Sequence, residues 1–278
     1  MNVKTQSISP EIASTEAPEE KESFASFLWF LTKLLLAVIL FRSLIFSPFS
    51  IPSESMLPRL WNGDYLLAAK WPYGYSSYSL PYSAPLIPGR VLAGEPERGD
   101  VVIFKHPIDK TDYVKRVIGL PGDSIAMIDG QILLNGELIE RRQVADFEIP
   151  LSVNTSCAWG GDEATNDAGE QVCRYTQFLE TLPSGRKYNV LDFGTTPADS
   201  FAPKIIPEGH MFVLGDNRDN SRDSRFEARA GDAVGIVPQE NLVGQATIIM
   251  WSTDGSAEWV KPWTWFSAAR WGRIGYTI

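Results

Sequence analysis

Cysteine and histidine are scarce in this chain of 278 residues, which has two of each. The cysteines, Cys157 and Cys173, lie 16 residues apart in a polar segment. A disulfide between them would indicate an oxidising compartment, and two separate thiols are the equally open alternative.

Several signatures of function are missing. The net charge of −9 gives no basic surface for phosphates, so no nucleic-acid partner is expected. The sequence has no internal repeat, no metal-ligand cluster and no phosphate-binding glycine loop. It also lacks the G-x-S-x-G elbow of a serine hydrolase. We therefore expect neither a cofactor nor a metal.

The N-terminal region divides into a polar part and an apolar part. Residues 1–23 are acidic and poor in large apolar side chains, and we expect a disordered cytoplasmic tail. Residues 24–46 form an apolar run of transmembrane length, interrupted by Lys33 and Arg42. A cleavable signal peptide would need a basic start and an A-x-A-like exit, so a retained anchor is favoured.

Beyond Ile51 no second long apolar run follows, which puts the rest of the chain on one side of the membrane. Lysine and arginine counts on the two flanks do not decide which side that is. The scarce cysteines favour the extracytoplasmic side only if they are bonded.

After the anchor the pattern is that of short β-strands. Apolar runs bounded by Gly, Pro and Asp predict strands at 63–70, 99–105, 112–119, 210–216 and 242–251. Asp129-Gly130 and Asn135-Gly136 between apolar runs predict two tight hairpins. These signals predict a mostly-β protein with a partly open barrel or sandwich.

The domain organisation follows from changes in composition. We expect a catalytic β domain from 47–125 and 205–260, interrupted by a β-rich hairpin and loop insertion at 126–204, whose part from Cys157 to Lys204 is polar and irregular. Residues 71–98 form a Tyr/Pro-rich surface excursion. The aromatic C-terminal tail, 261–278, lies at the membrane interface or packs on the domain.

Two serines, Ser53 and Ser55, follow the apolar run directly and raise the question of activation, since a hydroxyl needs a nearby base. His106 precedes a proline at a strand end and His210 opens a strand, so neither has a recognisable catalytic setting. Lys115 lies inside the apolar run DYVKRVIG, where burial would favour its neutral form. Exposure on an edge strand is the alternative for this lysine.

The segment GDNRDNSRDSR, from Gly215 to Arg225, interleaves carboxylates with arginines. Its spacing resembles a calcium loop only superficially, because glycine and glutamate are missing at the required offsets. A rigid hydrogen-bonded network that holds a neighbouring group is the better interpretation.

Taken in order, these pieces resemble bacterial signal peptidase I, an S26-type family of membrane-anchored serine/lysine endopeptidases. The matching segments are FSIPSESMLPRLWNGDYL, RGDVVIFK, DYVKRVIGLPGD and GHMFVLGDNRDNSRDSR. The resemblance implies removal of signal peptides from exported preproteins, after small residues in an A-x-A pattern. It also implies a monomer held by one span in the bacterial inner membrane, with its catalytic domain on the periplasmic side and the lipid bilayer as a partner.

The resemblance also implies roles for individual residues. Ser55 is the expected nucleophile and Lys115 its general base, oriented by a hydrogen bond from Ser221. Ser53 and the backbone N–H of Ser55 are expected to form the oxyanion hole. The supporting residues that it implies are Met56, Asp223 and Arg225. Glu54 is a departure, because many members have glycine at this position.

Two other classes of protein share parts of this pattern. A self-cleaving repressor of the same fold would carry an N-terminal DNA-binding helix-turn-helix, where this chain has an apolar run. A non-catalytic, membrane-anchored module on the same scaffold would be expected to lose Ser55, Lys115 or Ser221, and all three are present.

Overall fold

The computed structural model describes residues 24–158, 160–258 and 260–278, so the tail expected at 1–23 lies outside the described residues. The chain divides between Val38 and Ile39 into two compact units, which are considered separately.

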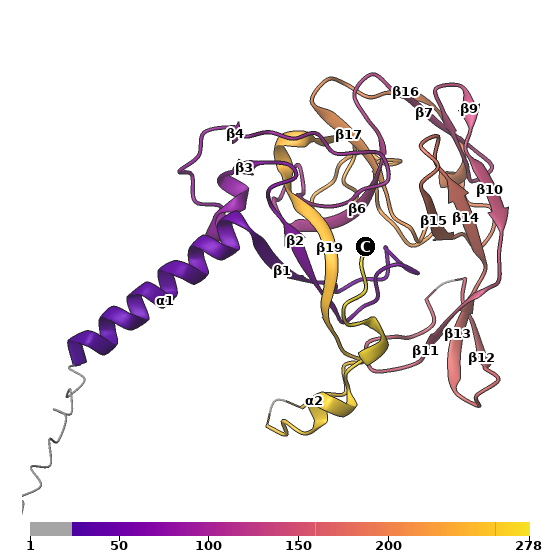
Figure 1. Ribbon diagram of the computed structural model, residues 1–278. Coiled ribbons are helices and arrows are strands. Elements are labelled where there is room, and N and C mark those ends of the chain that lie inside the picture. Colours follow the sequence, from indigo (N-terminus) through magenta and orange to yellow (C-terminus); the bar gives the residue numbers. More distant parts are fainter. Residues whose placement is uncertain (1–23, 159, 259) are drawn as a thin grey trace, which may run out of the picture. The chain divides into compact units, whose positions relative to one another are not determined.

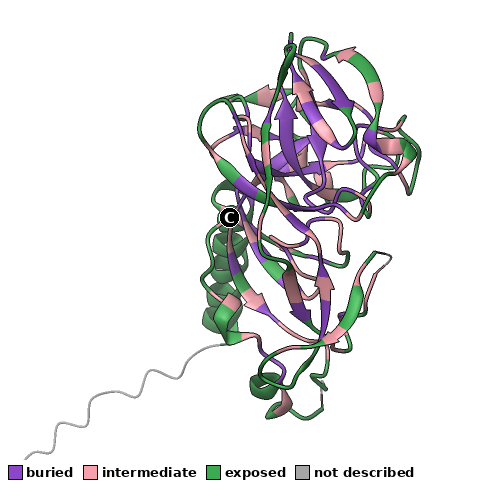
Figure 2. Cartoon of the chain, turned by 90° about the vertical axis from the view of Figure 1, so that its right-hand side faces the viewer, coloured by how far each residue is buried: buried purple, intermediate pink, exposed green. Residues whose placement is uncertain are grey.

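Helix α1, Phe24–Leu44, is long and apolar enough to cross a bilayer, with a mean hydropathy of 2.2 over its best 18 residues. Its 21 residues correspond to a length of about 30 Å, close to the thickness of a hydrocarbon core. Figure 2 shows its surface as exposed along its length, whereas the strands carry most of the buried residues. The helix ends at Leu44, so Phe46 of the apolar run already belongs to strand β1.

The larger unit is built on a seven-stranded antiparallel sheet curled into a half-barrel, which confirms the mostly-β prediction (Figure 1). The order of its strands is β1 (Phe46–Ser50), β2 (Asp64–Ala69), β19 (Leu242–Ser252), β5 (Val101–Lys105), β6 (Asp112–Gly119), β17 (His210–Leu214) and β18 (Val237–Pro238).

Four smaller sheets complete the unit. Their strands are β16 (Phe201–Ile205), β7 (Ser124–Ile128), β8 (Gln131–Leu134) and β9 (Glu137–Leu138); β10 (Glu140–Gln143), β14 (Gln177–Thr181) and β15 (Lys187–Leu191); β11 (Phe147–Pro150), β13 (Gln171–Tyr175) and β12 (Asp162–Thr165); and β3 (Tyr75–Ser76) with β4 (Arg90–Val91). The short helices are η1 (Ser77–Ser79), η2 (Pro81–Ser83), η3 (Pro197–Asp199), η4 (Gln239–Asn241), α2 (Thr264–Ser267) and η5 (Trp271–Arg273).

The two predicted hairpins connect β7, β8 and β9. Both residues of each turn, Asp129-Gly130 and Asn135-Gly136, have positive φ. This is the backbone of the primed turns that match the twist of paired strands, and Asn, Asp and Gly adopt it most readily.

Strand β5 shows how the central sheet is buried on both faces. Val101 and Ile103 pack into one apolar cluster with Leu66 and Met56. Val102 and Phe104, which point the opposite way, pack into a second cluster on the other face. A strand buried on both sides reads as a continuous apolar run, which is why VVIF was recognisable from sequence.

The segment from Cys157 to Lys204 is not irregular, contrary to the expectation. It contains strands β12, β13, β14 and β15 and most of β16. These strands mix buried residues with polar, exposed ones; in β13, for example, Gln171 is exposed whereas Val172 and Cys173 are buried. Short polar strands of this kind lack the apolar run that identifies a buried strand.

The C-terminal residues 261–278 pack at least partly on the domain. The guanidinium of Arg273 forms an ion pair with the buried Asp64, with a shortest distance of 2.5 Å. The side chain of Ile278 packs against a core cluster of the central sheet, and Thr277 bridges to Ile248 on β19.

Cys157 and Cys173 form a disulfide, which resolves the alternative left open by the sequence. Cys173 is fully buried beside Ile149, Tyr175 and Leu191, so the bridge belongs to the small core beneath β11 and β13. A bond of this type is typical of proteins outside the reducing cytosol.

We expect thiol labelling of the unreduced, denatured protein to find no free cysteine. Replacing both cysteines by alanine should lower the free energy of unfolding by about 2–4 kcal/mol, because a loop of this length then gains entropy in the unfolded chain. Chemical denaturation in detergent measures this difference. Quantitative labelling of both thiols without reductant would contradict the bond.

Candidate active site

Ser55 lies on a tight turn that follows β1, above a floor of buried side chains. The backbone N–H of Leu57 donates to the Glu54 carbonyl, and Met56 and Leu57 are both buried. Met56 packs with Leu66 and Ile103 of the sheet, as expected for a packing residue. The apolar floor fixes the turn, so the Ser55 hydroxyl stays at the surface of the sheet.

Lys115 lies on β6, opposite Val102 of β5, and its amine meets this hydroxyl. Its Nζ lies 2.5 Å from Ser55 Oγ, and the whole residue is 3% exposed. Of the two alternatives left open by the sequence for Lys115, exposure on an edge strand and burial, the structure shows burial. Two residues 60 positions apart in the chain form one polar contact in an apolar surrounding.

Burial lowers the pKa of Lys115 to about 8. The negative charges of Asp223 and Asp216 act in the opposite direction, and the positive charge of Arg225 adds to the lowering. Desolvation dominates because an ammonium group loses its hydration in the sheet without gaining an adjacent carboxylate. A sizeable neutral fraction of the amine therefore exists near pH 8.

The Gly215–Arg225 segment holds the other side of the Ser55 turn. The Asn217 backbone N–H donates to the Ser55 carbonyl at 3.1 Å, and its Nδ2 donates to the Glu54 carbonyl at 3.2 Å. A Cβ at position 215 would lie 2.5 Å from the Ser55 carbonyl oxygen and 2.3 Å from Ser221 Oγ. Glycine at 215 therefore permits the close approach of the two serine-bearing segments.

Asp223 and Arg225 form a buried ion pair within this segment, at 2.8 Å. The Gly215 N–H also donates to Asp223, and Arg225 donates to the Arg218 carbonyl. Although burial opposes ionisation, the guanidinium of Arg225 and these donors hold the pKa of Asp223 below its usual value. Asp223 and Arg225 thus belong to one buried hydrogen-bonded network, and their supporting role in catalysis remains a prediction.

Ser221 is buried, as an orienting residue should be, but the expected hydrogen bond to Lys115 is not formed. Its hydroxyl lies near enough to Asp223 to help lower the pKa of that carboxyl, yet it has no hydrogen-bond partner of normal geometry among the described residues. The Lys115 amine is directed to Ser55 Oγ instead. The orienting role of Ser221 remains a prediction.

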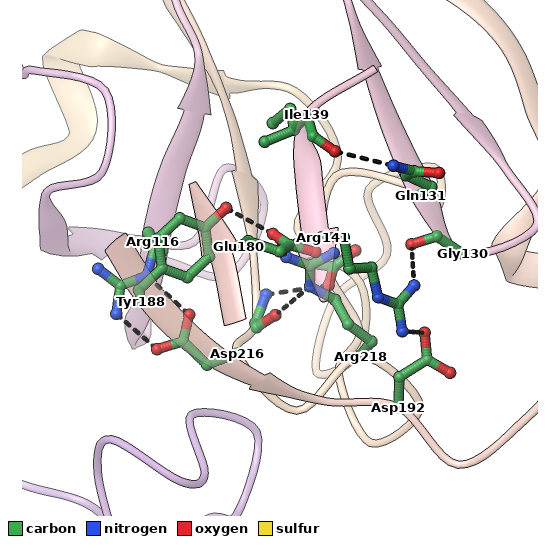
Figure 3. A network of polar contacts seen from close by, with 12 residues as sticks. Arg116, Gly130, Gln131, Ile139, Arg141, Glu180, Tyr188, Asp192, Asp216 and Arg218 are labelled. Carbon is green, nitrogen blue, oxygen red and sulfur yellow. Dashed lines mark hydrogen bonds and ion pairs between the residues drawn. The ribbon is translucent and has the colours of Figure 1, made fainter. Parts of the chain in front are cut away.

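A second layer of ion pairs connects the segment to the neighbouring strands (Figure 3). Arg116, on the opposite face of β6 from Lys115, binds Asp216 through two contacts of 2.7 and 2.6 Å. Arg218 pairs with Glu180 of β14 at 2.6 Å, and Glu180 also accepts from the Tyr188 hydroxyl at 2.7 Å. Breaking one partner of such a buried pair typically costs about 3–5 kcal/mol.

Neither histidine serves as a base for Ser55 in this arrangement. His106 is fully buried, contacts the Ala233 carbonyl through Nε2 and accepts from the Ile108 N–H through Nδ1. The ring of His210 contacts the Glu208 carbonyl. Both rings therefore form hydrogen bonds with nearby backbone groups.

Lys70 is a second buried lysine that the sequence did not indicate. It is 2% exposed at the end of β2, and burial lowers its pKa to about 8 as well. Its amine lies over the ring of Phe49, 5.6 Å from the centroid. Burial alone therefore does not mark a base, and the contact with a hydroxyl distinguishes Lys115.

Ser53 and Glu54 flank the contact. The Ser53 and Ser55 hydroxyl oxygens lie 3.4 Å apart, so Ser53 faces the space next to the potential nucleophile. Burial raises the pKa of Glu54, whose backbone carbonyl is held by Asn217. The Ser55 turn is therefore held by Asn217 of the Gly215–Arg225 segment even though position 54 is a glutamate and not a glycine.

A groove of about 430 Å³ leads to the two hydroxyls and the amine. One wall is the end of β1 and the following residues Phe49–Ser53, and the other is Thr111–Lys115 at the start of β6. Residues Asp112–Lys115 pair with β5, whereas β17 pairs with β6 only from Arg116 onward. Among the described residues, no strand pairs with this second edge of β6 where it lines the groove.

Comparison with known proteins places this arrangement in a family. Residues 24–251 match the model of the family described as signal peptidase, peptidase S26. The signal peptidase I of Rickettsia typhi is 40% identical over 243 residues, covering 84% of this chain and 81% of the relative. That of Rickettsia prowazekii is 38% identical with the same coverage. A solved signal peptidase I from Enterococcus faecalis is 25% identical, with a TM-score of 0.29 over 55% of this chain and 97% of that one.

The family model and the two Rickettsia relatives define a hydrolase of peptide bonds. The chain belongs to the signal peptidase I family, peptidase family S26, as the resemblance implied. Membership makes it an enzyme of signal peptide cleavage, whose substrates are preproteins. The apolar helix α1 fits attachment to a membrane.

The site residues that sequence reasoning missed are Gly215 and Asn217. Both lie in the segment whose charges attracted attention, but their contacts are made by the backbone and by an amide. Neither contact leaves a pattern of charge or hydrophobicity in the sequence.

Gly215→Ala should lower preprotein cleavage by about 100-fold or more and also lower the unfolding temperature. The added Cβ must displace the Ser55 carbonyl or Ser221, and misplacement of a reacting group by about 1 Å costs this much. Gly272→Ala is the matched control, because a Cβ there meets nothing within 4 Å. Equal cleavage rates for the two variants would contradict the steric argument.

Proposed function

We propose that this enzyme is a serine/lysine endopeptidase that cleaves signal peptides from exported preproteins after small residues, in an A-x-A pattern. The observation that carries the proposal is the 2.5 Å contact between Ser55 Oγ and the desolvated amine of Lys115. A neutral amine at this distance from a hydroxyl is an adequate general base.

In the first half of the reaction, Lys115 takes the proton of Ser55 while Oγ attacks the carbonyl carbon of the last signal-peptide residue. The Ser53 hydroxyl and the Ser55 N–H donate to the resulting oxyanion. The C–N bond then breaks, and the new amine receives the proton from Lys115. Ser53 suits this role because its hydroxyl lies beside that of Ser55.

In the second half, water attacks the ester on Ser55. Lys115 takes a proton from this water and returns it to Ser55 Oγ as the acyl group leaves. Ser221 is the orienting residue for the amine. Its buried hydroxyl has no other hydrogen-bond partner among the described residues, which leaves it available when the amine moves during the cycle.

An extended substrate segment fits the groove as an added strand. The second edge of Asp112–Lys115 offers backbone donors and acceptors on one side, and the chain after β1 lines the other. Main-chain pairing of this kind binds many sequences and leaves selection to a few side-chain pockets. Phe49, Ile51 and Met56 form an apolar part of the lining, which supports small, uncharged residues next to the cut.

We place the reaction at the extracytoplasmic surface of the bacterial inner membrane, with α1 as the single anchor and the enzyme acting as a monomer. The disulfide supports an oxidising compartment. The lipid surface as a partner is supported by exposed aromatic side chains near the C-terminus, among them Trp263, Phe266 and Trp271. Aromatic rings of this kind favour the boundary between lipid and water.

The alternative is a non-catalytic, membrane-anchored module on the same scaffold. It would have no need for a desolvated lysine in contact with a hydroxyl, and burying an amine costs stability. The retention of this contact favours the enzyme.

We expect Ser55→Ala and Lys115→Ala each to abolish cleavage of a preprotein by the purified protein, and Ser53→Ala to lower turnover about 100-fold. Lys110→Ala, which removes an exposed lysine from the connection between β5 and β6, is the control for loss of charge. Circular dichroism checks that each variant is folded. Full activity of a folded Lys115→Ala protein would eliminate the dyad.

The rate of acylation should rise with pH, with a midpoint near 8, because only the neutral amine accepts a proton and the pKa of Lys115 is about 8. Between pH 7 and 9 the neutral fraction, and with it the single-turnover rate, should increase about tenfold. A midpoint near 6.5 would indicate a histidine base, and one above 10 a solvated lysine.

A further inference from the structure

Three aspartates meet beside the Gly215–Arg225 segment, two from the connection between β15 and β16 and one from the segment itself. Asp192 follows β15, Asp199 ends η3, and Asp219 belongs to the segment itself. Each offers one carboxylate oxygen, and the three oxygens lie within 4.8 Å of one another. Like charges at this separation repel unless something lies between them.

The hydrogen bonds of the three carboxylates account for only some of their oxygens. Asp192 pairs with Arg141 at 2.6 Å, as Figure 3 shows, and accepts a long bond from the Gly194 N–H. One oxygen of Asp199 accepts from the Thr196 N–H, and one oxygen of Asp219 accepts from the Phe193 N–H.

The remaining oxygens of Asp199 and Asp219 point to a missing ligand. Asp199 is only 2% exposed, yet its Oδ1 has no hydrogen-bond donor among the residues that the structure describes. The Oδ1 of Asp219 is buried and has no donor either. A buried carboxylate oxygen without a donor costs free energy, so native proteins rarely leave one in this state.

The charges of the cluster give the same indication. Of the ion pairs among the described residues, the one that involves these three aspartates is that of Arg141 with Asp192. The cluster therefore has an excess of negative charge in a poorly solvated place.

We propose that Asp192, Asp199 and Asp219 bind a divalent cation, and that the cation is calcium. Hard carboxylate oxygens are the only donors that these three residues offer, and such donors favour hard cations over soft metals. Calcium accepts irregular sets of carboxylates and completes its shell with water, whereas magnesium demands a near-ideal octahedron. Surface pockets border Asp192 on one side and Asp219 on the other, which gives an ion access.

This site differs from the calcium loop that was considered and rejected in the sequence. That loop would have used Asp219, Ser221 and Asp223 in succession, and Asp223 is instead paired with Arg225. The proposed site takes only Asp219 from the segment. Asp192 and Asp199 lie in the connection between β15 and β16, so a bound ion would link that connection to the Gly215–Arg225 segment. The link would be made two residues before Ser221.

The test uses the full chain in detergent, freed of metal with a chelator, and CaCl₂ as the titrant. Calorimetry should detect one calcium ion per chain, with a dissociation constant of roughly 10⁻⁴–10⁻³ M, as in calcium modules outside the cell. Calcium at 10 mM should raise the unfolding temperature by about 3 °C or more over the chelated protein.

Asp199→Asn and Asp219→Asn are the informative variants, because an amide oxygen can still accept from Thr196 or Phe193. Both should lose the binding heat and the calcium-dependent shift. In chelator they should unfold at the same temperature as the unmodified chain or higher, since one repelling charge has been removed. Asp129→Asn is the control. Asp129 is exposed and lines the surface pocket that borders Asp192, and this variant should bind calcium and unfold as the unmodified chain does.

Two outcomes would overturn the proposal. One is the absence of both binding heat and thermal shift in the unmodified chain. A proton shared between the carboxyl groups of Asp199 and Asp219 would then explain their Oδ1 atoms. The other is a calcium effect that persists in both asparagine variants, which would place the ion elsewhere. Because both readouts are independent of cleavage, the test does not depend on the roles of Ser55 and Lys115.

Discussion

The desolvation of one amine is the constraint on which this structure depends. A lysine buried in a sheet is unfavourable, since the ammonium loses its hydration and Lys115 has no carboxylate in direct contact among the described residues. The sheet tolerates it because β5 and its neighbours are buried on both faces and supply the stabilisation. The same burial shifts the amine toward the neutral form that the proposed chemistry requires. Stability of the sheet and reactivity of the site are therefore linked by a single side chain.

The carboxylates near this amine must be kept from pairing with it. An unpaired Asp223 or Asp216 would raise the pKa of Lys115 further and return it to the charged form. Each is instead held by an arginine, Asp223 by Arg225 and Asp216 by Arg116. The two arginines thus do more than make the segment rigid. By pairing with Asp223 and Asp216, they prevent these carboxylates from forming an ion pair with the Lys115 amine.

Much of this arrangement could be predicted from sequence, and the physical reason differs from part to part. Strands such as Val101–Lys105 and the Asp129-Gly130 turn were predictable because their signals are local in the chain. The strands between Cys157 and Lys204 were not, since they are short, polar and half exposed. The burial of Lys70 was missed for another reason. Whether a lysine at a strand end is covered depends on segments that pack over it, and the local pattern does not contain them.

The Gly215–Arg225 segment shows how an irregular stretch of chain can hold groups in place as precisely as a sheet. Its backbone binds the Ser55 turn through Asn217, and its charged side chains bind three different strands or turns. Each of these contacts removes conformational freedom that a loop would otherwise keep. Because a buried charge without its partner is strongly unfavourable, the ion pairs favour one arrangement of the segment over others. Asp219 is the exception, because its neighbours are two further aspartates. The other charged side chains of this segment are held by partners of opposite charge, whereas at Asp219 like charges meet. A cation bound there would hold Asp219 by the same kind of electrostatic attraction.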